Sequence, residues 1–205
     1  VGLAALSSTG CVHQLLATGV YFWKGGNFVP AEGSALEEKR VVVVCRPPSS
    51  HEFRHAGAAR DIAKQVSRML RDNVPDVDVV NPREVDNWVD ERDWGDFREL
   101  GDAVKADMVV HIELDTFDLF KGKTLYQGQA DITVGVYDMA SPDDPVWDKH
   151  LGEVLFPVNS GIPAQDKSVQ QFQREYVAIV SQQIAHHFYE HDPHANFAID
   201  ALANR

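Results

Sequence analysis

Alternation of apolar and polar residues over positions 106–138 constrains the fold of this chain more than any other feature. Two runs show it, one on each side of Lys121-Gly122-Lys123, which supplies a turn glycine. The apolar positions are Met108, Val110, Ile112 and Leu114 in the first run, and Tyr126, Ala130, Ile132, Val134 and Val136 in the second. A period of two residues predicts two long antiparallel strands with one buried face and one face in water.

The segments around this hairpin carry further helical and strand patterns, which complete the predicted domain. In chain order we expect a strand at 41–45, a helix at about 51–73, a strand at 77–80, a helical stretch at 81–89, a helix at 93–105, the hairpin, a strand at 146–156 and a helix at about 166–189. A change of phase near Gly152 predicts a β-bulge in the last strand. The fold class is therefore α/β of the α+β kind. We expect a mixed sheet of about five strands in the order β-α-β-α-α-β-β-β-α, with helices mainly on one face.

The 205 residues are enough for one sizeable domain and a tail. We place a single α/β domain at residues 37–190 and a loosely ordered tail at residues 191–205. Residues 12–36 are expected to form a tether or linker, because glycine, proline and serine are frequent in the second half of that range. Residues 1–11 are expected to be the remnant of a signal peptide with a lipidation motif.

The chain begins with apolar residues, and the small residues Ser7-Ser8-Thr9-Gly10 then lead into Cys11. This stretch resembles the lipobox of bacterial lipoproteins, in which cleavage before the cysteine leaves a lipid-modified amino terminus. The resemblance implies acyl chains on Cys11, which would hold the protein on a membrane through their buried methylene groups. Val12 follows the cysteine in place of Asp. Under the sorting rules of bacterial lipoproteins this implies the outer membrane, with the domain on its periplasmic side.

A membrane-spanning anchor is the alternative for the same segment, because residues 1–23 contain no Asp, Glu, Lys or Arg. His13, Gln14 and three glycines make a poor spanning segment. Both interpretations tie the protein to a membrane, with the segment either cleaved or retained as an anchor.

The charge of the chain restricts its partners. A net charge of −12 and a sequence pI near 5.1 argue against nucleic-acid binding, since an acidic surface repels phosphate backbones. No glycine-rich phosphate loop follows a strand, and no serine nucleophile elbow is present.

We expect no cofactor. The expected partners are envelope proteins, the membrane through the lipid on Cys11, and a second copy of the chain.

Two stretches carry a resemblance to a known group of domains. Gly101-Asp102-Ala103-Val104-Lys105-Ala106-Asp107-Met108-Val109-Val110 resembles the entry into a long strand, and Val136-Tyr137-Asp138 followed by a polar turn and Val146-Trp147 resembles the hairpin after it. The group comprises the amino-terminal domain of TolB, the curli-secretion lipoprotein CsgG and the lipoprotein activators of peptidoglycan synthases. The likeness spans about residues 40–189 in topology and about two dozen residues in motif. It implies protein binding without catalytic residues, and no counterpart of the pore-forming strands of the curli channel is present.

One motif points to a different function. His51-Glu52-Phe53-Arg54-His55 fits the H-E-x-x-H pattern, in which two histidines one helical turn apart share a zinc ion and the glutamate activates a water. A zinc-dependent hydrolase that uses His51, Glu52 and His55 is therefore the alternative function. Arg54 argues against it because its cation would repel the metal, and the motif lies at the start of a helix with no evident third ligand.

Histidines are also concentrated near the carboxyl end of the last predicted helix. His187 and His191 are four residues apart, as are Glu190 and His194, so a surface metal site is geometrically feasible. Histidines at a helix carboxyl end more often complement the helix dipole. We therefore expect no specific metal there.

The polar face of the hairpin is the remaining candidate site. It carries His111, Glu113 and Asp115 on one strand and Gln127, Gln129, Asp131 and Thr133 on the other. Paired carboxylates do acid–base chemistry when a pocket separates their pKa values, and an open sheet face provides no such pocket. We therefore expect His111, Glu113, Asp115, Asp131 and Thr133 to form a contact face for a partner protein. The predicted function is a non-catalytic, membrane-anchored lipoprotein that acts as an interaction or assembly module of the cell envelope.

Overall fold

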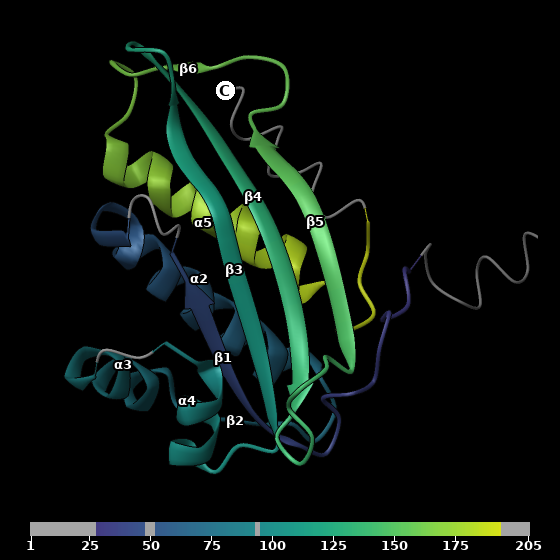
Figure 1. The fold of residues 1–205 in the computed structure, drawn as a ribbon. Coiled ribbons are helices and arrows are strands. Elements are labelled where there is room, and N and C mark those ends of the chain that lie inside the picture. The colour runs from purple at the N-terminus through teal and green to yellow at the C-terminus, as the bar shows by residue number, and fades with distance from the viewer. Residues whose placement is uncertain (1–27, 48–51, 93–94, 194–205) are drawn as a thin grey trace, which may run out of the picture. The chain divides into compact units, whose positions relative to one another are not determined.

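The computed structural model describes residues 28–47, 52–92 and 95–193, with the backbone alone for 52–56. Its helices and strands follow the expected order (Figure 1): β1 (Arg40–Arg46), α2 (Glu52–Asn73), β2 (Asp78–Val79), α3 (Pro82–Glu91), α4 (Phe97–Val104), β3 (Met108–Lys121), β4 (Leu125–Asp138), β5 (Trp147–Phe156), β6 (Ile162–Pro163) and α5 (Val169–Ala185). The two-residue strand β6 is an element that the sequence pattern does not predict. None of the described helices is long and apolar enough to cross a membrane.

The strands form one mixed sheet, which confirms the predicted fold class. Its order is β2-β1-β3-β4-β5, and β6 pairs with the first two residues of β4, Leu125 and Tyr126. Strand β1 runs parallel to β2 and β3, whereas β3, β4 and β5 are antiparallel to one another. The predicted hairpin is confirmed along its length, from the pair Met108–Asp138 to the pair Lys121–Leu125.

Helices α2 and α5 contact each other and pack behind the sheet in the view of Figure 1. The buried side of the hairpin supplies the strand half of this core, and aromatic rings from both layers meet there. Phe172 and Tyr176 of α5 are fully buried, and the Tyr176 ring lies 5.4 Å from the ring of Phe117 on β3. The Tyr176 hydroxyl donates a hydrogen bond to the Val154 carbonyl of β5 over 2.7 Å. Gly128 of β4 lies against the Tyr176 ring with no room for a side chain.

Helices α3 and α4 build a second, smaller core on the opposite face, at the β1 end of the sheet (Figure 1). Strand β1 serves both cores because its successive valines point to alternate faces. The residues of this second core are Val42, Val44, Val80, Val85, Trp88, Leu100, Val104, Ala106 and Val109. The front face of the sheet is therefore covered at its β1 end, whereas none of the described helices lies over its β4 and β5 strands.

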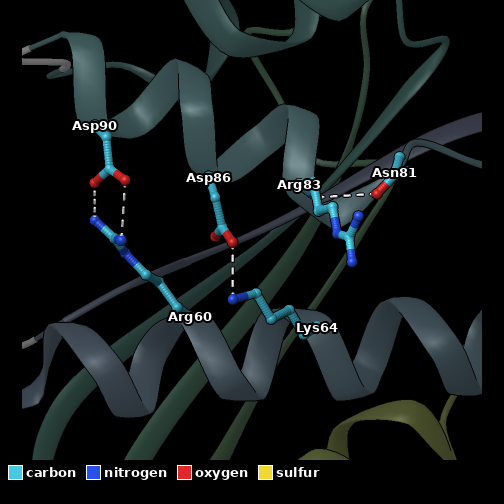
Figure 2. Close-up of polar contacts among 6 residues, drawn as sticks. All are labelled: Arg60, Lys64, Asn81, Arg83, Asp86 and Asp90. Carbon is cyan, nitrogen blue, oxygen red and sulfur yellow. Dashed lines mark hydrogen bonds and ion pairs between the residues drawn. The ribbon is translucent and has the colours of Figure 1, made fainter.

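Ion pairs join α3 to α2 (Figure 2). Arg60 of α2 forms two hydrogen bonds with the carboxylate of Asp90, and Lys64 Nζ lies 2.8 Å from Asp86 Oδ2. The Asn81 side chain caps α3 by accepting a hydrogen bond from the Arg83 backbone N–H over 3.0 Å. These exposed pairs orient the two helices while their apolar sides face the sheet.

The chain divides into two compact units, Ala31–Tyr189 and a second one formed by Val1–Pro30 with Glu190–Arg205. In the described part of the second unit, Val29 and His191 exchange two backbone hydrogen bonds of 2.8 and 3.1 Å. The first unit includes Leu36, which is 1% exposed and belongs to the buried core. Glu32, which lies in the expected linker, contacts Lys149 of β5 and His187, each within 3.0 Å.

Candidate functional site

The candidate site is the front face of β3, β4 and β5, which none of the described helices covers and which we call the open face. Register and exposure place polar side chains of all three strands on it. It comprises Glu113, Asp115, Thr116 and Asp118 of β3, Gln127, Gln129, Asp131, Thr133 and Tyr137 of β4, and Asp148, His150, Glu153 and Leu155 of β5. Of the five residues predicted for this face, Glu113, Asp115, Asp131 and Thr133 therefore lie on it.

The prediction that His111 lies in water is wrong. His111 is 7% exposed because Phe97 of α4 covers it, with 4.9 Å between the ring centroids. The Phe97 ring also contacts Tyr137, so three aromatic rings close the β1 end of the open face. Burial lowers the pKa of His111 from its ordinary value, an effect that outweighs the opposing influence of Glu113. The imidazole therefore lies beneath Phe97, which packs against the second core, and does not lie in water.

Tyr137 marks the boundary between the aromatic rings and the acidic groups of the open face. Its phenol has a raised pKa, first through partial burial and then through the nearby negative charges of Glu113 and Asp148. The side chain lies over Gly135, where a Cβ would be 2.7 Å from the ring. The open face thus begins at Glu113 and extends towards the hairpin turn.

Two β-bulges lie at the middle of the open face, one on each side of β4. In β3 the register shifts between Leu114 and Thr116, which leaves Asp115 as the extra residue. In β5 the register shifts between His150 and Gly152, and Gly152 adopts a φ of +71°. The second bulge confirms the change of phase expected near Gly152, and a positive φ explains why glycine occurs there.

Four polar side chains meet between the bulges. His150 lies opposite Thr133, with its Nδ1 3.2 Å from Thr133 Oγ1, and its Nε2 is 3.4 Å from Asp131 Oδ1. The Thr133 hydroxyl is also 3.5 Å from Asp115 Oδ2. Asp115, Asp131 and His150 each offer one metal-ligating atom, and these atoms all lie within 4.8 Å of one another.

His150 is the member of this group that the sequence analysis did not place on the face. The signal for it was present, since Asp148 and His150 alternate with Trp147 and Lys149 in a predicted strand. What the sequence does not specify is that β5 pairs with β4 so that His150 lies opposite Thr133. That pairing depends on the position of the bulge.

The open face is strongly acidic. Carboxylates of Glu113, Asp118, Asp148 and Glu153 surround the central group, and Glu153 accepts a hydrogen bond from the Gln129 amide across the β4–β5 pair. His150 is the one basic side chain among the residues that define the open face. A face with this charge would attract a cationic surface or a metal ion.

The other predicted sites have different outcomes. Cys11 and His51 lie outside the described residues, and Glu52 and His55 lie in α2 with undescribed side chains, so lipidation and the zinc motif stay predictions. His187 Nδ1 lies 3.0 Å from Glu32 Oε1. With Lys149, whose hydrogen bond is the larger effect, it lowers the pKa of Glu32. His191 forms the backbone pair with Val29.

Comparisons with known proteins give neighbours among solved structures alone. No family model matches the chain, and a search of the curated proteins finds no match. The chain is similar to the PelC dodecamer from Paraburkholderia phytofirmans, at 11% identity over 78% of this chain and 93% of that chain, with a TM-score of 0.46. It is also similar to lipoprotein GNA1162 from Neisseria meningitidis (10% identity, 71% and 96% coverage, TM-score 0.41) and to hypothetical protein CT253 from Chlamydia trachomatis (12% identity, 69% and 95% coverage, TM-score 0.35).

These neighbours include a lipoprotein and a protein that forms dodecamers. TM-scores below 0.5 establish neither family membership nor function, so the chain's own residues carry the functional proposal. The resemblance to the TolB, CsgG and synthase-activator group stays a prediction.

Proposed function

We propose that this protein is a non-catalytic lipoprotein of the bacterial envelope that binds a partner protein through the open face. The observation that carries the proposal is the acidic, solvent-facing surface of three adjacent strands, which none of the described helices covers. A sheet holds such side chains on rigid elements, which suits contact with a folded partner. The second core and helices α2 and α5 support the sheet from the two covered regions.

The charge of the open face specifies the chemistry of the partner. Exposed carboxylates on β3 and β5 give the face a negative potential, so the complementary surface would carry Lys or Arg. Charge pairs at the rim of such a contact act mainly on the association rate and are weakened by salt. We therefore expect binding to a basic surface that becomes weaker as ionic strength rises.

Non-catalytic action is the interpretation that best fits the surroundings of the carboxylates. Acid–base catalysis needs two carboxylates in environments that separate their pKa values, and this usually requires a water-excluding pocket. Asp115, Asp118 and Glu153 are exposed side chains on a sheet surface. The zinc-hydrolase alternative depends on His51, Glu52 and His55, and it is tested by peptidase assays of a His55→Ala variant.

The anchor is a separate part of the proposal, since it rests on the residues around Cys11. Metabolic labelling of cells with an alkyne analogue of palmitate tests it directly. We expect label on the wild-type chain and none on Cys11→Ala, with the protein in the outer-membrane fraction and accessible from the periplasm. Label that persists in Cys11→Ala would contradict lipidation at this residue.

Crosslinking in intact envelopes tests the partner face with a matched pair of variants. Asp118→Lys with Glu153→Lys reverses two charges on the open face, and Asp61→Lys with Asp72→Lys reverses two exposed charges on α2. We expect the first variant to lose a crosslinked partner that the second retains. Equal capture by both would refute the open face as the contact surface. Self-association remains a prediction that light scattering at rising protein concentration checks.

A further inference from the structure

The centre of the open face has the geometry of a metal site built from three strands. Asp115 of β3, Asp131 of β4 and His150 of β5 present ligand atoms that lie within 4.8 Å of one another. Zinc bonds of about 2 Å in a tetrahedral arrangement separate ligand atoms by roughly 3.3 Å. His150 Nε2 and Asp131 Oδ1, at 3.4 Å, already have this spacing. Asp115 is exposed and needs only a side-chain rotation to complete the set.

One carboxylate oxygen of Asp131 has no hydrogen-bond donor in the described part of the chain. Asp131 Oδ1 is buried, although the residue is only half-buried, and it accepts no hydrogen bond within the described part of the chain. Buried carboxylate oxygens are normally satisfied by donors or by a cation. Its neighbour His150 Nε2 is close enough to share a cation with it. His150 can pair with Asp131 only when Nε2 carries a proton, and a metal ion between the two atoms would satisfy Asp131 when it does not.

The second nitrogen of His150 is held by Thr133. With Nδ1–H donating to Thr133 Oγ1 over 3.2 Å, the lone pair of Nε2 is free to bind a metal. The Thr133 hydroxyl can then donate its own hydrogen towards Asp115 Oδ2, 3.5 Å away. One hydroxyl thus orients two of the three ligands, as outer groups commonly do in metal sites.

The two bulges provide independent support, because they change the direction of the side chains at this one level of the sheet. The β3 bulge adds Asp115 beside Leu114, and the β5 bulge adds Leu151 between His150 and Gly152. Bulges are frequent next to functional sites, where they re-aim a side chain. Both shifts adjoin Ile132, so they act on the strand segment that carries Asp131 and Thr133.

We infer that Asp115, Asp131 and His150 bind one divalent transition-metal ion of the zinc class, with Thr133 orienting the ligands. One imidazole nitrogen and two carboxylate oxygens suit Zn²⁺ better than Ca²⁺ or Mg²⁺, which prefer oxygen ligands alone. Three protein ligands leave a coordination position open to water or to a side chain of another protein. The inference does not depend on the proposed partner, since metal binding is measured on the isolated protein.

Zinc titration calorimetry of the chelator-treated full chain tests this inference. A His187→Ala/His191→Ala background removes the histidine pair that the sequence offers as a surface metal site, so that zinc bound by that pair is not counted. In this background we expect one Zn²⁺ per chain and weaker binding of Mg²⁺. Binding of no zinc would overturn the inference.

Four single substitutions in the same background identify the ligands. We expect Asp131→Asn and His150→Ala to weaken zinc binding at least tenfold, and Thr133→Val to weaken it about tenfold. Glu153→Gln is the matched control, a carboxylate of the same face outside the ligand set, and should bind as before. Unchanged affinity in Asp131→Asn and His150→Ala, with their circular dichroism spectra unaltered, would overturn the inference. An equal loss in Glu153→Gln would also overturn it, because it would indicate diffuse attraction to an acidic face.

Discussion

Replacing Gly128 by alanine should destabilise the protein more than alanine at any other described glycine of the sheet. Gly128 lies on the buried side of β4, and an ideal Cβ there would be 2.4 to 2.6 Å from three carbons of the Tyr176 ring. Ordinary carbon–carbon contacts are about 3.5 to 4.0 Å, so the ring would have to move by roughly 1 Å. Tyr176 is fully buried, with Phe117 and Phe172 as neighbours, and has little space to move into.

The expected cost follows from these contacts. Overpacking a tight core costs about 1–3 kcal/mol. Displacing the ring also strains the hydrogen bond from the Tyr176 hydroxyl to the Val154 carbonyl, which is worth about 1 kcal/mol. Alanine lowers the conformational entropy of the unfolded chain relative to glycine, and this offsets the loss of stability by roughly 0.4–1 kcal/mol. We therefore expect Gly128→Ala to lower the free energy of unfolding by about 1–3.5 kcal/mol.

Urea denaturation of four chains tests this reasoning: wild type, Gly128→Ala, Tyr176→Leu and the double variant. If the clash with the ring is the cause, Gly128→Ala should cost at least about 1 kcal/mol less when Tyr176 is already leucine. Gly57→Ala is the control, since a Cβ at Gly57 of α2 meets nothing within 4 Å and should be neutral or stabilising. Additive effects of the Gly128 and Tyr176 substitutions would refute the steric account.

Three further predictions follow from other parts of the structure. Burial lowers the pKa of His111 in the folded protein, so on acidification the unfolded chain binds a proton at this residue before the folded chain does. The contribution of His111 to the free energy of unfolding is therefore fully present above about pH 6.5, and it falls as the pH drops from there towards the pKa of His111 in the folded protein. His111→Phe should flatten this part of a stability–pH curve. Gly152→Ala and Gly122→Ala both force a φ of +71° on alanine and should each cost about 1 kcal/mol in urea denaturation, but only Gly152→Ala should weaken zinc binding. Burial also raises the pKa of the Cys45 thiol, so a Cys11→Ser chain should react with a thiol reagent only after unfolding.

The element order and the hairpin were predictable because they depend on local periodicity. Alternation in residues 106–138 specified two strands, and the change of phase near Gly152 specified the bulge. These patterns repeat over two to four residues, so they are visible in a single sequence. The fold class followed from the order in which they occur.

The environment of His111 was not predictable by the same means. The strand pattern placed it correctly on the face opposite Met108 and Val110, but exposure depends on what covers that face. Phe97 covers it, and Phe97 belongs to a helix packed by the second core. Phe97 lies in the helix predicted at 93–105, yet no local pattern states which strand residue its ring contacts. Contacts between separate elements are fixed by packing rather than by periodicity.

The bulges explain why the candidate site combines residues that the sequence analysis found with one that it did not. Without a bulge in β3, Asp115 would lie opposite Asp131, two like charges facing each other directly, which is destabilising. The bulge instead pairs Thr116 with Asp131, and the Asp131 backbone N–H donates to the Thr116 hydroxyl over 3.1 Å. The β5 bulge places His150 opposite Thr133. The irregularities therefore replace the direct Asp115–Asp131 pairing and leave both carboxylates close to His150, with ligand atoms within 4.8 Å of one another. Bulges of this kind are frequent next to functional sites.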